Sequence, residues 1–581
     1  MLNGLTAVAV LVVVFHALLS YAIFGLGLAA AVTPDTLAWA SAASLLVTLV
    51  AAKRLWPLVL AEKGLSNTDA LILACGAALI VAPFLHVLVL PPFHEDDLIY
   101  HLNVPKRILQ TGALLADPFS LTTNFPMLFE MPFTALLASK WPISPLLVNV
   151  LYLYGYALAF AAFLRSELRL TLPWTLAATL AFAWMPLHYA IVQSCYVELF
   201  LGLVTLLGLQ FYLRSLRSNG RLLDWLLSML FLGFGAATKY LGLVPLAAVL
   251  LAELVRPAQR RRLALGILVA ALVALPWYVK NWLFLGNPLY PFAPQLFPTP
   301  ELSVDRYLKM KTLLDFYNQG TALTDYFMLP LRVLWAGDWT PQPGSFGFGG
   351  KLSLLCAFAA FSGGYQSQGA RTVRWMLLVY LVVWVASAQN VRYLMPFLVL
   401  PIALGLKVLL ERGRSARWLA AVLLLLAAVQ SAWNIGKDMR DLQIDQVVMG
   451  TLSSDAFLSA RIPQVKAASE LANRHLDPLK DRAMFIGGFG RALLIDAPVL
   501  ANTFSDVEIF NIAFARGSVD PTLADRFFAG QGITHLLLID ATARKLLQTL
   551  PDLDADAVDR YLAGHATVVA SQAGASLLQL H

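Results

Sequence analysis

Long apolar segments recur along the first three quarters of this chain, and they constrain its fold more than any other feature. A helix that crosses a bilayer needs about 20 predominantly apolar residues. Of the 581 residues, 59% are hydrophobic and 13% are charged. The charged fraction of a typical soluble protein is about 25%. The sequence therefore predicts a polytopic membrane protein that is mainly α-helical.

We expect about thirteen membrane-spanning helices. The first segment is too long for a removable signal peptide, and it lacks a basic start and a small-residue cleavage site. It is therefore predicted to be a retained helix. The predicted spans cover residues 5–31, 36–51, 69–91, 143–164, 171–190, 196–213, 222–238, 240–255, 262–284, 349–364, 374–388, 393–411 and 416–434.

Basic residues gather in alternate loops between these segments. Short loops rich in Lys and Arg face the cytoplasm, so the pattern predicts a cytoplasmic N-terminus in a cytoplasmic (inner) membrane. The loops 92–142 and 285–348, and the chain from residue 435, then lie on the outer face. The basic residues predicted to be cytoplasmic are Lys53, Arg54, Lys63, Arg165, Arg169, Arg214, Arg217, Arg221, Arg256, Arg260, Arg261, Arg262, Arg371, Arg374, Arg412, Arg414 and Arg417.

Two domains are predicted, a membrane domain over 1–434 and a small extracytoplasmic α/β domain over 435–581. The second domain has the composition of a soluble protein. Gly487 to Gly490 lacks a third glycine and a ribose-binding acid, so it is interpreted as a plain strand–helix turn. Buried strands are expected over 483–486, 535–539 and 566–569, and helices near 463–474 and 541–550.

Three consecutive carboxylates, Glu95, Asp96 and Asp97, follow the third predicted span. Acids at the mouth of a span are costly, which favours a role in chemistry or cation binding. The alternative is a solvated loop whose acids stabilise the N-terminus of the next helix. Apolar spacing over 97–110 predicts a helix in the interface plane, interrupted at Pro105 and ended by Gly112.

The order of several motifs resembles the GT-C superfamily of membrane glycosyltransferases. An acidic pair, a Tyr and a helix ending in Gly are matched by Asp96, Asp97, Tyr100 and Gly112. Glu198 stands where Asp is more usual, and Glu95 is an extra acid. Further matching stretches, which extend the resemblance over roughly 70–410, are 196–198, 239–240, 276–281, 286–291 and 392–396.

This resemblance implies the activity. GT-C enzymes such as protein O-mannosyltransferases and the lipid A aminoarabinose transferase use polyprenyl-phosphate sugars. It implies an inverting hexosyl- or pentosyltransferase. The acceptor is an unknown glycan, lipid or protein, and the enzyme is surrounded by membrane lipids. The alternatives are transfer of a whole lipid-linked glycan, or a transporter or flippase. A transporter would favour an internal repeat, which is not evident. The charge pattern does not suggest nucleic-acid binding.

Sugar transfer from a lipid phosphate needs a base for the nucleophile and cations for the departing phosphate. Asp96 is the first choice for the base, followed by Glu95 and Asp97. Neighbouring carboxylates raise one another's pKa, which suits a base near neutral pH. Alternatively, these acids hold a divalent cation. The flanking His94 and His101 lack zinc-ligand spacing.

Candidate phosphate-binding cations lie at the predicted outer ends of spans. They are Lys239, Lys280 and Arg392, and Arg392 is favoured because a guanidinium can contact phosphate with two bonds. The alternative for each is a snorkelling side chain. Glu198 either pairs with one of these cations or holds the acceptor, and Tyr100 is expected to contact substrate.

The long outer loop 285–348 is expected to cover the site. It carries Arg306, Lys309 and Lys311 on a predicted helix, and glycines over 344–350 that suggest a hinge.

Overall fold

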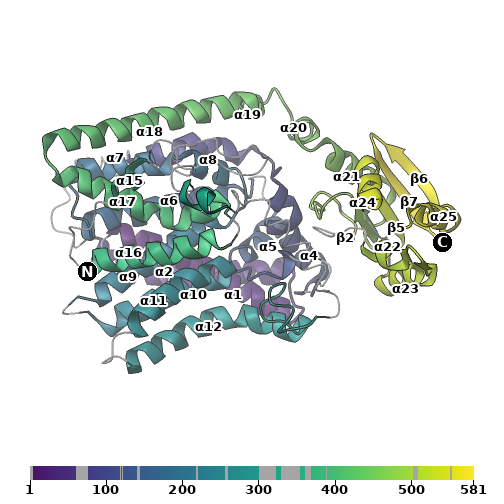
Figure 1. Ribbon diagram of the computed structural model, residues 1–581, viewed down its shortest axis with the longest axis horizontal. Helices are drawn as coiled ribbons and strands as arrows, with labels where there is room; N and C mark the ends of the chain where they lie inside the picture. Colours follow the sequence, from purple (N-terminus) through teal and green to yellow (C-terminus); the bar gives the residue numbers. More distant parts are fainter. Residues whose placement is uncertain are drawn as a thin grey trace.

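The computed structural model contains a large helical bundle and a small α/β domain beyond one end of it (Figure 1). The N-terminus lies at the opposite end of the bundle from the C-terminal domain. The predicted cationic helix with Arg306, Lys309 and Lys311, and the glycines over 344–350, lie outside the described residues. The structure describes residues 4–60, 76–299, 322–328, 352, 354–359, 368–501, 508–549 and 553–581, with gaps at 115, 118–119, 121, 141–143, 218–219, 255–259 and 388.

Each of the thirteen predicted spans contains helix, because apolar residues without backbone breaks favour internally satisfied hydrogen bonds. The helix in the third segment is short, Gly76–Leu88, and ends in the 3-10 helix η1 (Ala82–Leu88). The other helices are α1 (Gly4–Leu28), α2 (Pro34–Leu60), α6 (Leu147–Ser166), α7 (Leu172–Ala183), α8 (Pro186–Val192), α9 (Glu198–Ser215), α10 (Leu222–Thr238), α11 (Leu243–Leu254), α12 (Arg260–Leu285), α15 (Leu354–Ala359), α16 (Gln368–Val385), α17 (Met395–Glu411) and α18 (Arg414–Asp441).

The expected number of spans is not confirmed. Among the described residues, six helices are long and apolar enough to cross a membrane, and the bent pair α7 and α8 would make seven. Three further apolar helices among these residues are shorter, Gly76–Leu88, Leu222–Thr238 and Tyr240–Leu254. The domain boundary predicted at residue 434 falls inside α18, which continues to Asp441.

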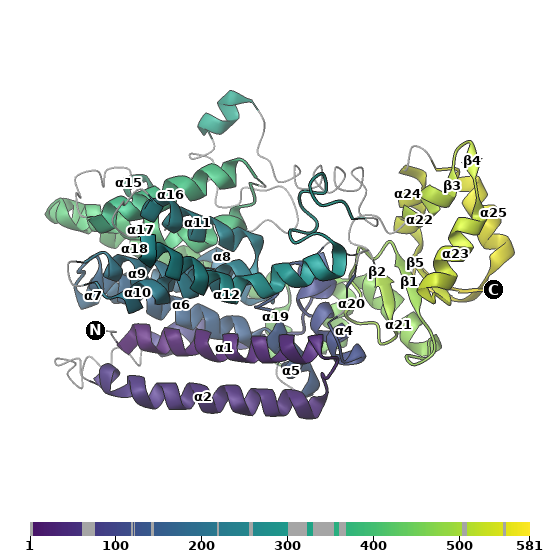
Figure 2. The same cartoon turned by 90° about the horizontal axis from the view of Figure 1, so that it is seen from below.

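The bundle has a buried centre and an apolar outer surface. Helices α6, α9 and α17 are buried along most of their length. Helices α2 and α18 expose large apolar side chains such as Leu46 and Val429, as lipid-facing helices do. Figure 2 shows α1 and α2 lying side by side along one face of the bundle.

The C-terminal domain is built on a mixed five-stranded sheet of order β2-β1-β5-β7-β6. Strand β1 (Ala483–Ile486) is parallel to β2 (Val499–Ala501) and β5 (His535–Ile539). Strand β7 (Ala575–Leu580) is antiparallel to β5 and β6 (Ala566–Gln572). The other elements are α19 (Ile444–Val448), α20 (Ser454–Arg461), α21 (Pro463–His475), α22 (Glu508–Ala513), β3 (Phe514–Ala515), β4 (Ser518–Val519), α23 (Pro521–Gln531), α24 (Asp540–Thr549) and α25 (Ala555–His565).

Two predictions for this domain are wrong. The strand expected to be buried at 566–569 belongs to β6, an edge strand, and Val568 on it is exposed. The glycine turn after β1 does not lead into a helix. Gly487 and Gly490 adopt positive φ angles of 80° and 83°, and the chain then runs through a loop to the parallel strand β2. The predicted strands at β1 and β5 and the helices at α21 and α24 are confirmed.

The acidic run leads into the predicted interfacial helix. A π-helical turn, η2 (Asp97–His101), is followed by α4 (Asn103–Thr111), with Pro105 in the first turn of α4. Gly112 ends α4 in the left-handed conformation with φ 72°, as predicted from its position. The outer loop continues through η3 (Thr122–Asn124) and α5 (Met131–Ala138).

Candidate active site

An ion-pair cluster joins four parts of the chain that are far apart in sequence. Asp96 precedes η2, Glu198 begins α9, and Lys239 follows α10. Arg392 lies in the 3-10 helix η7 (Val391–Leu394). The guanidinium Nη1 of Arg392 donates to Asp96 Oδ2 at 3.0 Å. Glu198 Oε1 lies 3.1 Å from Lys239 Nζ and 3.4 Å from Arg392 Nε.

Local backbone structure fixes both cations of this cluster. The side chain of Asn390 accepts a hydrogen bond from the Arg392 backbone at 2.9 Å, which starts η7 at this point. Lys239 lies in an extended break between α10 and η4 (Tyr240–Gly242). A Cβ on Gly242 would lie 2.0 Å from the Gly235 carbonyl oxygen. Only glycine therefore permits the tight turn that follows Lys239.

Aromatic rings enclose the two cations. The Arg392 guanidinium carbon lies 4.4 Å from the centre of the Tyr196 ring. Lys239 Nζ lies 4.7 Å from the centre of the Tyr393 ring. Such contacts favour cations in sites that exclude water. The cluster has no net formal charge, since it contains two carboxylates and two cations.

The three acids of the run occupy different environments. The Asp96 side chain is 25% exposed, so it remains accessible beside Arg392. Asp97 is fully buried, and its Oδ1 accepts the backbone N–H of Cys195 at 2.8 Å. Burial raises the pKa of Asp97 well above its usual value, with a smaller contribution from Asp96. Its burial and its bond to the Cys195 backbone make Asp97 a structural group.

The capping interpretation of these acids is not supported. Asp96 occupies the position before η2, but its side chain accepts no backbone hydrogen bond there.

Glu95 is exposed, and partial desolvation raises its pKa while Arg491 opposes the rise. Repulsion from Asp96 also raises the pKa of Glu95, as expected for adjacent carboxylates, although it is the smallest contribution.

A buried pair beside this cluster was not predicted as part of the site. His101 Nδ1 and Glu130 Oε1 are joined by a hydrogen bond of 2.8 Å, and both side chains are almost fully buried. Burial raises the pKa of Glu130 to about 8 and holds that of His101 well below its usual value. His101 was considered only as a metal ligand. The sequence feature that could have predicted this pair is Glu130, an acid inside an apolar stretch that returns to the membrane.

The remaining two predicted substrate-binding residues lie outside the ion pairs. Tyr100 is buried, and its ring centre lies 6.4 Å from that of Phe125. Lys280 is buried near the end of α12 and lines a separate pocket against α4. The structure therefore brings Asp96, Glu198, Lys239 and Arg392 together, and Lys280 contacts none of them.

The C-terminal domain contacts the same outer loop. Lys106 Nζ on α4 donates to the carbonyl oxygens of Leu493, at 2.9 Å, and Ile495. The Leu493 N–H donates to the Leu98 carbonyl in η2 at 3.3 Å. The loop after the glycine turn thus packs directly on the two short helices that follow Asp96. We refer to residues 491–496 as the docking loop.

A metal centre is not evident in the part of the chain that the structure describes. Those residues contain no group of three His, Cys, Asp or Glu side chains that could hold a metal ion. The divalent cation considered from sequence stays untested.

The architecture matches that of solved membrane proteins. ArnT from Cupriavidus metallidurans bound to undecaprenyl phosphate superposes with a TM-score of 0.54 at 14% identity, over 88% of this chain and 98% of ArnT. The chain has the GT-C fold. The apo state of ArnT gives a TM-score of 0.51 with the same coverage and identity.

A further solved structure is more distant. The apo oligosaccharyltransferase of Archaeoglobus fulgidus gives a TM-score of 0.46 at 11% identity, over 80% of this chain and 69% of that protein. No family model and no curated protein sequence matches this chain. The resemblance drawn from the sequence motifs is thus confirmed for the fold.

Proposed function

We propose that this protein transfers a single sugar from a polyprenyl-phosphate donor to an acceptor at the outer face of a cytoplasmic membrane. The observation that carries the proposal is the pairing of a partly exposed carboxylate, Asp96, with a buried arginine at an interfacial helix. The GT-C fold supports a membrane glycosyltransferase. The solved ArnT holds undecaprenyl phosphate, which favours a lipid of that class here.

In the proposed reaction Asp96 is the general base. It takes the proton from an acceptor hydroxyl or amine as that atom attacks the anomeric carbon. The bond from the anomeric carbon to the phosphate oxygen breaks, and polyprenyl phosphate leaves with the electron pair. A single displacement inverts the anomeric centre. Of the three acids, Asp96 suits the role best, because Asp97 is fully buried against the Cys195 backbone and Glu95 does not bond Arg392 in the described structure.

Arg392 and Glu198 position the base in this scheme. Arg392 bonds one carboxylate oxygen of Asp96 and leaves the other for the acceptor. Glu198 compensates the charges of Arg392 and Lys239, so that both cations can stay buried. The contacts of Tyr196 and Tyr393 with these cations exclude water from the site.

The proposal can be tested with purified protein in detergent. A panel of radiolabelled polyprenyl-phosphate sugars is supplied with a membrane extract as the source of acceptor, and release of polyprenyl phosphate is measured. We expect release from at least one donor, and loss of release in Asp96→Asn. Failure with every donor would contradict the proposal. Movement of intact sugar lipid across vesicles without cleavage would favour the transporter alternative.

A further inference from the structure

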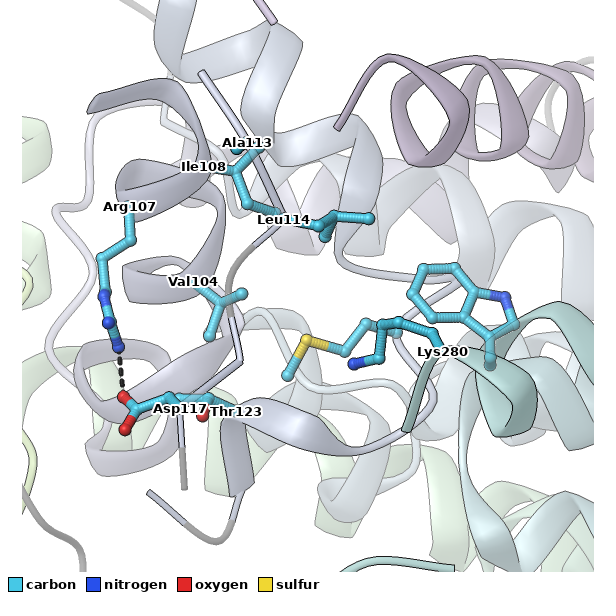
Figure 3. Close-up of a pocket in the computed structure, with 10 residues that line it drawn as sticks. Val104, Arg107, Ile108, Ala113, Leu114, Asp117, Thr123 and Lys280 are labelled. Carbon is cyan, nitrogen blue, oxygen red and sulfur yellow. Dashed lines mark hydrogen bonds and ion pairs between the residues drawn. The ribbon is translucent and has the colours of Figure 1, made fainter. Parts of the chain in front are cut away.

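A small pocket lies between α4, the following loop and the outer part of α12. It is partly open and is lined by apolar side chains and a few polar ones. Figure 3 shows the Lys280 side chain with its ammonium group directed into this pocket. Its lining residues are Val104, Arg107, Ile108, Ala113, Leu114, Asp117, Thr123, Met127, Trp277 and Lys280.

Lys280 carries a charge that the described part of the chain does not neutralise. Only 6% of the residue is exposed, and no ion pair or hydrogen bond joins its Nζ to a described residue. A buried, unpaired ammonium is costly unless a ligand compensates it. The nearest charges in the pocket are Arg107 and Asp117, which pair with each other. The pocket therefore has a net positive charge of about one.

The ion-pair cluster at Asp96 differs from this pocket in its charge. Arg392 and Lys239 are matched there by Asp96 and Glu198, so that the cluster offers little net attraction to an anion. The Lys280 pocket combines an uncompensated cation with an apolar wall. This combination suits an anionic group that is attached to a hydrocarbon chain.

We propose that the Lys280 pocket binds the phosphate of the polyprenyl lipid, with Lys280 Nζ contacting a phosphate oxygen. This inference rests on the proposed function and names the residue that holds its leaving group. A glycosylated lipid phosphate carries one negative charge, and the released monoester carries about −1.5 to −2 at pH 7. A pocket with an uncompensated positive charge stabilises the charge that develops as the sugar departs.

Binding of a short-chain polyprenyl phosphate without sugar tests this inference. Affinity is measured on the full-length protein by thermal shift and by direct titration, for wild type, Lys280→Met and Lys280→Arg. Lys140→Met is the matched control, since Lys140 is an exposed lysine of the loop 92–142, which forms one side of the pocket. The corresponding polyprenyl alcohol and inorganic phosphate serve as control ligands.

We expect Lys280→Met to weaken binding about 10- to 100-fold, because it removes a charge-assisted contact, and Lys280→Arg to restore part of it. Lys280→Met should fold at least as stably as wild type, since Met replaces an unpaired buried charge. Lys140→Met should bind as wild type does. The alcohol and inorganic phosphate should both bind much more weakly than the lipid phosphate, because the pocket is expected to bind both the phosphate and the hydrocarbon chain.

Three outcomes would overturn the inference, and they are distinguishable. If wild type and Lys280→Met bind within twofold of each other, the phosphate lies elsewhere and the proposed function stands. Loss of binding in Arg392→Ala but not in Lys280→Met would place the phosphate at the ion-pair cluster. If wild type binds no lipid phosphate and cleaves no donor, the proposed function fails as well.

Discussion

Arg392 and Asp96, which are 296 positions apart in sequence, meet through a hydrogen bond of 3.0 Å at the end of the helical bundle that contacts the C-terminal domain. The arginine is buried and the carboxylate is partly exposed. The guanidinium also contacts Glu198, which is buried. The arginine therefore links a buried carboxylate to the partly exposed carboxylate of Asp96. This relationship makes the first outer loop a candidate active site rather than a solvated connection.

Removal of the base should abolish transfer without unfolding the protein. We expect Asp96→Asn to lower kcat on the order of a hundredfold or more, since general base catalysis contributes that much. Asp97→Asn should have a much smaller effect, because Asp97 is buried away from the site opening and Asn can still accept the Cys195 N–H. Donor turnover at saturating donor measures both. Full turnover in Asp96→Asn combined with Glu95→Gln would contradict the assignment.

Arg392 should act through Asp96. Arg392→Ala is expected to reduce kcat/KM strongly, and Arg392→Lys less, because an ammonium retains one of the two contacts. A double-mutant cycle with Asp96→Asn measures the coupling. The losses should be far from additive if Arg392 positions the base. Additive losses would show that the two side chains act independently, and a thermal melt of each variant checks folding.

Stability should depend on pH through Glu130. Its pKa in the folded protein is about 8, above the usual value of 4.5, so its contribution is most favourable below pH 4.5 and is lost as pH rises towards 8. Glu130→Gln keeps a hydrogen-bonding group opposite His101 but cannot ionise. We therefore expect the Tm of wild type to fall relative to that of Glu130→Gln between pH 5 and pH 8. A constant difference over that range would exclude this linkage.

Lys106 should hold the docking loop on α4. Lys106→Met removes the bonds to the carbonyl groups of Leu493 and Ile495 and the ion pair with Asp496 at 3.7 Å. We expect faster amide hydrogen exchange over residues 491–496, measured by mass spectrometry. Lys480→Met, at an exposed position of the same domain, is the control and should leave that exchange unchanged. Equal protection in both variants would argue against a tether at Lys106.

The two ends of the bundle should lie on opposite sides of the membrane. The basic loops predict a cytoplasmic N-terminus, and the N-terminus and the C-terminal domain lie at opposite ends of the helices. Reporters inserted at residue 258 and fused after residue 581 should therefore respond oppositely to a membrane-impermeant label. Labelling on the same side would refute the orientation and the outer location of Asp96.

Local pattern was sufficient to predict much of the secondary structure. Each apolar segment became helical because a backbone within a membrane must satisfy its hydrogen bonds internally. Gly112 could be predicted as the end of α4, since a left-handed residue after an interfacial helix is usually glycine. The edge position of β6 could not be predicted, because alternating apolar residues look alike whether a neighbour covers them or not.

The sequence by itself determined the membrane class, the helical segments and the acidic run that opens the first outer loop. Only the tertiary structure decided which residues meet. It paired Asp96 with Arg392, buried Asp97 against the Cys195 backbone and joined His101 to Glu130. It also left Lys280 facing a pocket apart from the other cations. Ion pairs between helices depend on how the helices pack, and residue spacing along one chain carries no record of that packing.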